Sequence, residues 1–326
     1  MFSRILYFIG AFCMLSFVTA CAETQSTENK IETFVDKHGW LSVKETSLVD
    51  ENSEILVMKG VSLGWHNWWS QFYNESTVTW LQNDWGCNLV RAAIGVEPNG
   101  AYIDNSVLAN NCLDNVIDAA IKNGMYVIID WHSHNMRTEE AKAFFTRVAN
   151  KYKDYPNIIY EIFNEPERIS WEEVKSYSEE LIKTIIAIDK KNIILVGTPH
   201  WDQDIHLAAD NPIKGYDNIM YTLHFYAATH KKDLRDRADY ALKKGIPIFI
   251  SECAGMEATG DGTIDHQEWD TWVEWMAKNN ITWVAWSVSS KNETCSMIKD
   301  NSSPISNWTT NDLKEWGVLV KSLLKK

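Results

Sequence analysis

The sequence predicts a single α/β domain folded as a (β/α)8 (TIM) barrel, with an N-terminal β-hairpin before the first barrel strand. Continuous runs of Val, Ile and aromatic residues recur along the chain, as in "KNGMYVIIDWH", "YPNIIYEIFNEP" and "KKGIPIFISEC". Such runs are typical of parallel strands buried on both faces, and a helical segment with a short polar stretch precedes each of them. Eight runs spaced about one βα unit apart fit a closed barrel better than an open doubly wound sheet.

The predicted elements follow from this rhythm in chain order. The segment "HGWLSVKETSLVDENSEILVMKG" predicts a hairpin that covers the lower end of the barrel. The eight barrel strands are predicted at residues 56–63, 88–96, 126–132, 158–165, 193–198, 219–226, 246–252 and 281–288. Trp269, Trp272 and Trp275 have helical spacing, which predicts a helix packed on the barrel. The last helix is expected to begin near Asn311, and residues 34–326 are expected to form one domain.

The N-terminus is predicted to be a targeting segment. Arg4 is the only charge before an apolar run over residues 5–18, which is too short to span a bilayer but suits a signal peptide. The run ends in "VTAC", which resembles the bacterial lipoprotein box. We therefore expect removal of residues 1–20, lipid attachment at Cys21, a tether over residues 21–33, and an exported, membrane-anchored protein. The alternative is ordinary cleavage, a free Cys21 and a secreted protein.

Composition narrows the class of ligand. The net charge of -13 and pI near 5.2 argue against a nucleic-acid partner, because no basic stripe is present to neutralise phosphates. A neutral or cationic ligand fits better. The 16 Trp exceed what a core requires. Trp combines a flat apolar face with an N–H donor, which suits the faces of sugar rings.

The cysteines beyond Cys21 do not indicate a metal site. Cys87, Cys112, Cys253 and Cys295 show no CxxC spacing, so a zinc site is unsupported. Export would permit disulfides, and isolated buried thiols are an equal alternative. His132 and His134 in "HSH" would point the same way from a strand, as a metal pair does. No metal or cofactor is expected, because no further ligands are arranged around them.

Polar and aromatic side chains gather at the predicted C-terminal ends of the strands. In a barrel these ends converge on one mouth, where catalytic residues lie. Two of the side chains are carboxyl groups, Glu165 after the fourth strand and Glu252 on the seventh. Hydrolysis of a glycosidic bond needs one carboxyl group to protonate the leaving oxygen and another to attack the anomeric carbon or activate water. Arg91 is expected to lower the pKa of one carboxyl, while a drier setting raises that of the other.

Six motifs together resemble glycoside hydrolase family 5, particularly its bacterial endoglucanase branch: "RAAIGV", "DWH", "IIYEIFNEP", "YTLHFYA", "FISEC" and "AWSVSSK". They occur in order over nearly the whole chain after the predicted signal. The resemblance implies a retaining mechanism with Glu165 as acid/base and Glu252 as nucleophile. It also implies that Arg91 and Tyr226 support the nucleophile and that Asn164 binds the sugar 2-hydroxyl.

The resemblance extends to residues that contact sugars. His132 and His224 match the family's active-site histidines. The implied sugar-binding residues are Trp286 as an exposed platform beneath the cleaved sugar, Trp201 on the leaving-group side, Trp68 as a stacking residue, and Lys291 and Glu293 at the next sugar. One departure follows strand one, where the family's histidine falls on Gly64. His66 either substitutes for it or faces solvent.

Three functions are compatible with the sequence. The favoured one is an endo-β-1,4-glucanase (cellulase) acting on cellulose or β-glucan, with no obligate protein partner. The second is the same machinery acting on mannan, xyloglucan or xylan, because specificity resides in loop contacts to individual hydroxyls. The third is a non-catalytic glycan-binding lipoprotein, against which the two glutamates argue.

Overall fold

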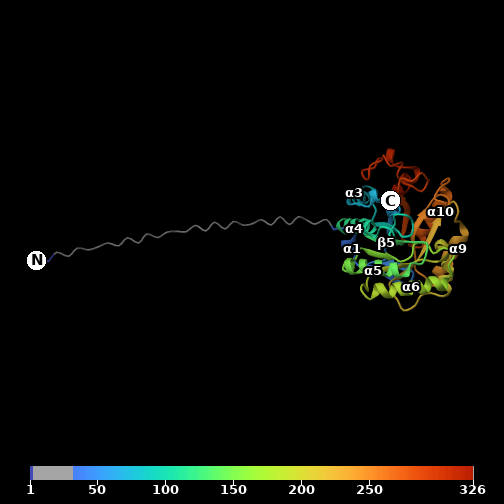
Figure 1. Cartoon of the computed structure of the whole chain (residues 1–326), viewed down its shortest axis with the longest axis horizontal. Helices are drawn as coiled ribbons and strands as arrows, with labels where there is room; N and C mark the ends of the chain where they lie inside the picture. The colour runs from blue at the N-terminus through green and yellow to red at the C-terminus, as the bar shows by residue number, and fades with distance from the viewer. Residues whose placement is uncertain (3–31, 326) are drawn as a thin grey trace. The chain divides into compact units, whose positions relative to one another are not determined.

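A computed structural model of the chain describes residues 1–2 and 32–325 (Figure 1). Cys21 and most of the predicted signal peptide and tether lie outside these residues, so those assignments stay predictions. The first element is helix α1 (Phe34–His38), whose N-terminus is capped by the side chain of Thr33. In the described part of the chain, no helix has both the length and the apolar character needed to cross a membrane.

Eight parallel strands close into a barrel, which confirms the predicted fold. The order around the barrel is β10-β3-β4-β5-β6-β7-β8-β9, with every neighbouring pair parallel. The strands are β3 (Lys59–Leu63), β4 (Leu89–Gly95), β5 (Tyr126–His132), β6 (Ile158–Glu161), β7 (Ile193–Val196), β8 (Ile219–Tyr226), β9 (Ile248–Ala254) and β10 (Trp283–Val288).

Strand β6 ends four residues earlier than the sequence predicts. After Glu161 the chain turns towards the loop that follows β5, where the backbone N–H groups of Asn164 and Glu165 donate to the carbonyls of Trp131 and Ser133 at 3.2 Å. Pro166 then has no N–H to donate to a sheet. Glu165 therefore stands on a loop that is fixed by backbone hydrogen bonds.

Helices surround the barrel, as Figure 1 shows for several of them. The longer ones are α4 (Ser106–Lys122), α5 (Thr138–Tyr152), α6 (Trp171–Ile186), α9 (Lys232–Lys243), α10 (His266–Lys278) and α11 (Glu315–Leu324). Shorter segments are α2 (His66–Trp69), α3 (Glu75–Trp80), α7 (Pro199–Asp202), α8 (Ile205–Asp210), the 3-10 turns Ser70–Phe72 and Thr310–Asp312, and a π turn over Leu81–Trp85. The predicted packing of α10 is confirmed, because Trp272 is buried and stacks on Phe225 with ring centroids 4.0 Å apart.

The predicted hairpin is also present and lies at the lower end of the barrel. It consists of β1 (Ser42–Lys44) and β2 (Ser47–Val49). Leu41 and Leu48 belong to one apolar cluster with inward-facing strand residues such as Ile128 and Ile159. The hydroxyl of Tyr126 donates to the carbonyl of Gly39 at 2.7 Å. The hairpin thus closes the end of the barrel that is remote from the mouth.

The barrel interior changes from apolar to polar towards the mouth. On β4, β6 and β9 the inward apolar residues are followed two positions later by Arg91, Glu161 and Ser251. Side chains two apart in a strand share a face, so these polar groups form the next layer. Strand β9 also carries a bulge, because Thr222 pairs with Phe249 but His224 pairs with Glu252. Bulges re-aim side chains, and here both Ser251 and Glu252 bond to groups at the mouth.

The four cysteines of the domain are buried free thiols. Cys87, Cys112, Cys253 and Cys295 form no disulfide with one another. Of the two alternatives left open by the sequence, the structure has isolated thiols.

Candidate active site

Two carboxyl groups and one imidazole form the centre of the mouth. One side-chain atom from each of Glu165, His224 and Glu252 lies within 4.8 Å of the others. Carboxyl groups about 5–5.5 Å apart suit a retaining glycosidase, whereas about 6.5–9.5 Å leaves room for the water of an inverting one. The separation of the two glutamates is therefore on the retaining side of this comparison. We assign no metal to this group, because the cationic Arg91 already lies 3.0 Å from Glu252.

Arg91 organises the floor of the site. Its guanidinium is fully buried and donates to Glu252 at 3.0 Å, to Glu161 at 2.7 and 3.2 Å, and to the side-chain oxygen of Asn164 at 2.6 Å. It also lies 2.9 Å from the carboxylate of Asp130. A planar guanidinium can satisfy several oxygens at once in fixed directions. Arg91 therefore sets the relative positions of strands β4, β5, β6 and β9 at the mouth.

Glu252 accepts hydrogen bonds on both carboxylate oxygens. Arg91 donates to Oε2, and the hydroxyl of Tyr226 donates to Oε1 at 2.7 Å. Burial and the charge of Glu165 raise the pKa of Glu252, while His224, Arg91 and Tyr226 act in the opposite direction. The carboxylate is aimed into the mouth, as a nucleophile requires.

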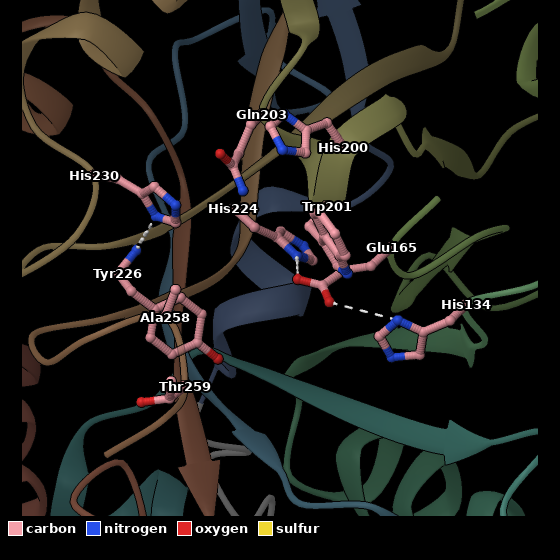
Figure 2. Close-up of a pocket in the computed structure, with 10 residues that line it drawn as sticks. All are labelled: His134, Glu165, His200, Trp201, Gln203, His224, Tyr226, His230, Ala258 and Thr259. Carbon is pink, nitrogen blue, oxygen red and sulfur yellow. Dashed lines mark hydrogen bonds and ion pairs between the residues drawn. The ribbon is translucent and has the colours of Figure 1, made fainter. Parts of the chain in front are cut away.

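Glu165 is bonded to His224 on one side, as Figure 2 shows. Oε1 lies 3.0 Å from Nδ1 of His224, and Oε2 lies 3.9 Å from Nδ1 of His134. Burial raises the pKa of Glu165, but the hydrogen bond and positive charge of His224 lower it, and the net direction is downward. The sequence led us to expect a lowered pKa for the carboxyl bound to Arg91 and a raised pKa for the other. The directions in the structure are the reverse, because His224 adjoins Glu165 and a second carboxyl group adjoins Glu252.

The cleft extends to both sides of the two glutamates. One part has a volume of about 500 Å³, and ten residues line it: His134, Glu165, His200, Trp201, Gln203, His224, Tyr226, His230, Ala258 and Thr259 (Figure 2). The other part is lined among others by Trp65, Trp68, Trp69, His132, Glu165, Glu252, Trp286, Lys291 and Glu293. Glu165 and Tyr226 line both parts, so the reacting groups lie at the junction of a groove that can hold several sugars.

The predicted aromatic platforms differ in exposure. Trp68 is 51% exposed, and Trp201 is partly exposed beside Arg168. The expectation that Trp286 is an exposed platform is wrong, since it is only 8% exposed. Its ring stacks on His132 with centroids 5.2 Å apart, and its carbonyl accepts a hydrogen bond from the indole of Trp316. Trp286 lines the cleft with a small part of its surface and is otherwise packed in the core.

Both alternatives for His66 are wrong. The ring is fully buried and faces Tyr73 rather than the cleft, and neither of its nitrogens has a hydrogen-bond partner among the described residues. Burial lowers the pKa of His66 to about 4, so it is a neutral packing residue. A side chain at Gly64 has no room either, because a Cβ there would lie 2.7 Å from Trp69. The cleft-facing place is taken by Trp65, whose ring meets the edge of His132 at 4.2 Å.

The remaining predicted residues of the barrel lie in or beneath the cleft, and several others join them. Lys291 and Glu293 are paired at 2.5 Å on one wall of the cleft. Sequence reasoning assigned no catalytic or sugar-binding role to several residues of the site, namely Asp130, Glu161, Asp202 and Ser251 beneath the glutamates, and His134, His200 and His230 in the cleft. A carboxylate inside an otherwise apolar strand, as in "IIYEIF", was the available signal for Glu161. Nothing comparable marked Asp202.

Paired carboxyl groups at this spacing, at the mouth of a barrel and in a groove lined with indole rings, define a glycoside hydrolase. The chain belongs to the cellulase family, glycosyl hydrolase family 5, whose sequence profile matches residues 49–292.

Individual relatives agree with this assignment. The chain is 39% identical to an endoglucanase of Clostridium saccharobutylicum over 98% of its length and 72% of that protein. It is 40% identical to endoglucanase A of Evansella cellulosilytica, over 82% of this chain but only 56% of that protein. A solved structure from Cytophaga hutchinsonii has a TM-score of 0.88 at 42% identity, covering 90% of this chain and 96% of the other. A variant of the catalytic domain of an endoglucanase from Thermobifida fusca, in complex with cellotetraose, has a TM-score of 0.85 at 29% identity, with coverages of 90% and 99%.

Proposed function

We propose that the protein is an endo-β-1,4-glucanase that hydrolyses internal bonds of cellulose or β-glucan with retention of configuration. Glu165 is the acid/base and Glu252 the nucleophile. The observation that carries the proposal is the approach of these carboxyl groups to within 4.8 Å at the junction of a groove that continues on both sides. The relatives named endoglucanase and the cellotetraose complex support a β-1,4-glucan as the substrate.

In the first step the carboxylate of Glu252 attacks the anomeric carbon while Glu165 protonates the leaving oxygen. Arg91 and Tyr226 hold both oxygens of Glu252, so the attacking group is fixed before the sugar arrives. Both oxygens of Glu252 already accept a hydrogen bond, which favours its ionised form. A proton on Oε1 of Glu165 can be donated to His224, and this difference favours Glu165 as the acid.

In the second step Glu165 acts as a base on the water that hydrolyses the glycosyl-enzyme. Asn164 supports both steps. Its side-chain oxygen accepts from Arg91, which turns the amide nitrogen away from Arg91. That nitrogen is buried and lacks a hydrogen-bond partner within the part of the chain that the structure describes. It is a preorganised donor for the sugar 2-hydroxyl, whose hydrogen bond strengthens in the transition state.

Alanine variants in the presence of azide test the two roles. Glu252→Ala is expected to fail on natural and dinitrophenyl substrates, and azide then restores turnover with an α-glycosyl azide as product. Glu165→Ala is expected to form the intermediate from a dinitrophenyl glycoside and to yield a β-glycosyl azide. On a substrate without an activated leaving group, Glu165→Ala is expected to lose about 10²- to 10⁴-fold in rate, because proton transfer to the leaving oxygen is missing. Opposite anomers in the two variants would overturn the assignment.

Substrate class and mode of attack need separate assays. Carboxymethyl cellulose and mixed-linkage β-glucan are expected to release reducing ends, with a rapid fall in viscosity because cleavage is internal. Mannan, xyloglucan and xylan serve as comparisons, and faster hydrolysis of any of them would overturn the substrate assignment. Proton NMR of the first product is expected to show the β-anomer.

We also propose that the chain is exported and anchored through a lipid on Cys21. The support is the apolar run that ends in "VTAC" and the polar residues between it and the domain. Cys21→Ser is expected to move the enzyme from the membrane fraction to the soluble fraction. Unchanged membrane retention of this variant would contradict the anchor.

A further inference from the structure

Asp202 is a buried carboxyl group beneath the acid/base, on an unusual turn. It ends α7, in which His200, Trp201 and Asp202 have φ values of 60°, 54° and 58°. Three successive non-glycine residues in the left-handed region are strained, by about 1–2 kcal/mol each. Such strain persists only where surrounding contacts impose it, and it is concentrated at functional sites. The side chain of Asp202 is fully buried and points away from the cleft side of the turn, towards β8.

The hydrogen bonds around His224 fix where its protons lie. The buried carboxylate of Glu161 accepts a hydrogen bond from Arg91. It also accepts one from the hydroxyl of Ser251 at 2.5 Å. Ser251 has one proton, so its oxygen must accept from Nε2 of His224 at 2.9 Å. Nε2 therefore carries a hydrogen, and Nδ1 faces Glu165 across one hydrogen bond. One proton is shared by this pair, either on Glu165 or on His224 as an imidazolium.

Asp202 touches the other end of the same imidazole. Its Oδ2 lies 3.3 Å from Nε2 of His224 and 2.5 Å from the hydroxyl of Thr222, while Oδ1 accepts from the backbone N–H of Thr198 at 2.6 Å. Thr222 is also within 3.2 Å of the carbonyl of Val196. A hydroxyl has one proton to give, so a protonated Asp202 that donates to Thr222 satisfies every group.

Burial raises the pKa of Asp202 to about 8, against the opposing effect of His224. Burial lowers the pKa of His224, but the charge of Asp202, ahead of the bonds to Glu161 and Glu165, raises it well above its usual value. The carboxyl groups that face His224 are Asp202 on α7, Glu161 and Glu165 on and after β6, Glu252 on β9 and Asp130 on β5. The cationic or basic groups that face it are Arg91 on β4, His132 on β5 and His230 after β8. The proposed glycosidase mechanism does not use Asp202 directly. Among these carboxyl groups, Asp202 is also the one whose hydrogen bonds favour the protonated form.

We propose that Asp202 is a positioning residue that controls the acid/base through His224: neutral Asp202 leaves the shared proton on Glu165, and ionised Asp202 draws it onto His224. The charge of Asp202 acts more strongly on His224 than on Glu165, because Coulomb energy falls with distance and, of these two groups, Asp202 contacts the imidazole. As the pH rises through about 8, Asp202 ionises and Glu165 loses its proton. The inference rests on the proposed role of Glu165 as general acid.

The test compares the pH dependence of kcat/KM for the parent and Asp202→Asn. The amide retains an acceptor for Thr198 and a donor for Thr222 but cannot ionise. With cellopentaose, which needs the general acid, the alkaline limb is expected to move up by about one pH unit or more, since one unit is a tenfold change in the proton equilibrium. With a dinitrophenyl cellobioside, which needs no acid, the two profiles are expected to coincide.

A nearby carboxyl provides the matched control. Asp204 is two residues away and is paired with Arg237 at 2.7 Å, without contact to His224. Asp204→Asn removes the same charge and is expected to leave the limb in place. If thermal unfolding shows that Asp202→Asn does not fold, Asp202→Ser takes its place, because it also removes the ionisable group. The same upward shift of the alkaline limb is expected for it.

Three other outcomes would overturn the role of Asp202. Hydrolysis of cellopentaose with an unmoved alkaline limb in Asp202→Asn overturns the inference and leaves the proposed function intact. An equal shift with both substrates also overturns it, because the charge would then act on Glu252. Absence of cellopentaose hydrolysis by the parent overturns the proposed function and, with it, this inference.

Discussion

At the scale of single residues, Arg91 and Glu161 are the least replaceable part of the site's floor. Both side chains are fully buried, and they are joined by two hydrogen bonds at 2.7 and 3.2 Å. Desolvating such charges is expensive, so the pair itself adds little net stability, but removing one partner leaves the other uncompensated. Glu161 also accepts a hydrogen bond from the hydroxyl of Ser251. This bond leaves the oxygen of Ser251 to accept from His224, which orients the imidazole.

Glu161→Gln is therefore expected to damage both stability and catalysis. The free energy of unfolding is expected to fall by about 3–5 kcal/mol, as when one partner of a buried ion pair is lost. Urea denaturation measures this. Glu75→Gln is the control, because the pair of Glu75 with Lys122 is exposed and such pairs contribute about 0–1 kcal/mol. Equal losses in the two variants would contradict the described burial of Glu161.

The two indoles Trp68 and Trp286 make a second contrast between residues. Trp286→Ala is expected to lower activity on polymer and to destabilise the fold by about 3–5 kcal/mol, because its ring is buried against His132. Trp68→Ala is expected to weaken polymer hydrolysis while changing stability by about 0.5 kcal/mol or less, since 51% of the residue is exposed. Thermal unfolding of the two variants, measured beside their KM for β-glucan, separates these expectations. A stable Trp286→Ala enzyme would show that the ring is not part of the core.

At the scale of elements, short irregular segments aim the reactive groups. The bulge in β9 brings Ser251 and Glu252 to the same mouth, and the loop after β6 places Glu165 across from them. The loop after β3 shows how neighbouring packing limits such a segment. At Gly64 the space for a side chain is filled by Trp69 and Ser289.

Gly64→Ala is expected to lower the free energy of unfolding by about 1–3 kcal/mol, the range for overpacking a filled site. The added Cβ would lie 2.7 Å from Trp69 Cδ1 and 2.9 Å from Ser289 Cβ, so the indole must move. Denaturant unfolding followed by tryptophan fluorescence measures the change in the free energy of unfolding and reports the movement of the indole. An alanine variant as stable as the parent would show that Trp69 gives way without cost and that a side chain can occupy the family's histidine position.

At the scale of the whole molecule, the barrel places an excess of carboxyl groups around few cations. Asp130, Glu161, Glu165, Asp202 and Glu252 surround Arg91 and His224, so the site cannot ionise completely. Mutual repulsion and burial make the pH dependence of activity a property of the whole cluster.

The acid limb of activity follows from this crowding. Burial and the charge of Glu165 raise the pKa of Glu252 above its usual 4.5. A raised pKa keeps the carboxyl protonated to higher pH, and a protonated Glu252 cannot attack. We expect the acid limb of kcat/KM on a dinitrophenyl cellobioside to lie above pH 4.5, measured where the fold is intact by circular dichroism. A limb below that value would show that Arg91 and Tyr226 outweigh burial.

The sequence by itself determined the barrel and the two glutamates. Apolar runs with a regular spacing indicate strands buried on both faces, and strand ends in a barrel must meet. The eight strands, the hairpin and α10 could therefore be predicted, and the strand ends indicated Arg91, Asn164, His224 and Tyr226 together with Glu165 and Glu252.

Only the tertiary structure decided the orientation and burial of individual side chains. His66 turned into the core because Trp65 and Trp69 fill the space near the mouth, and Trp286 is covered by His132 and by its neighbours. Asp202 came beneath His224 through a left-handed turn that no residue preference signals. Local sequence fixes which face of a strand a residue takes, whereas loops, bulges and protonation depend on contacts between segments far apart in the chain.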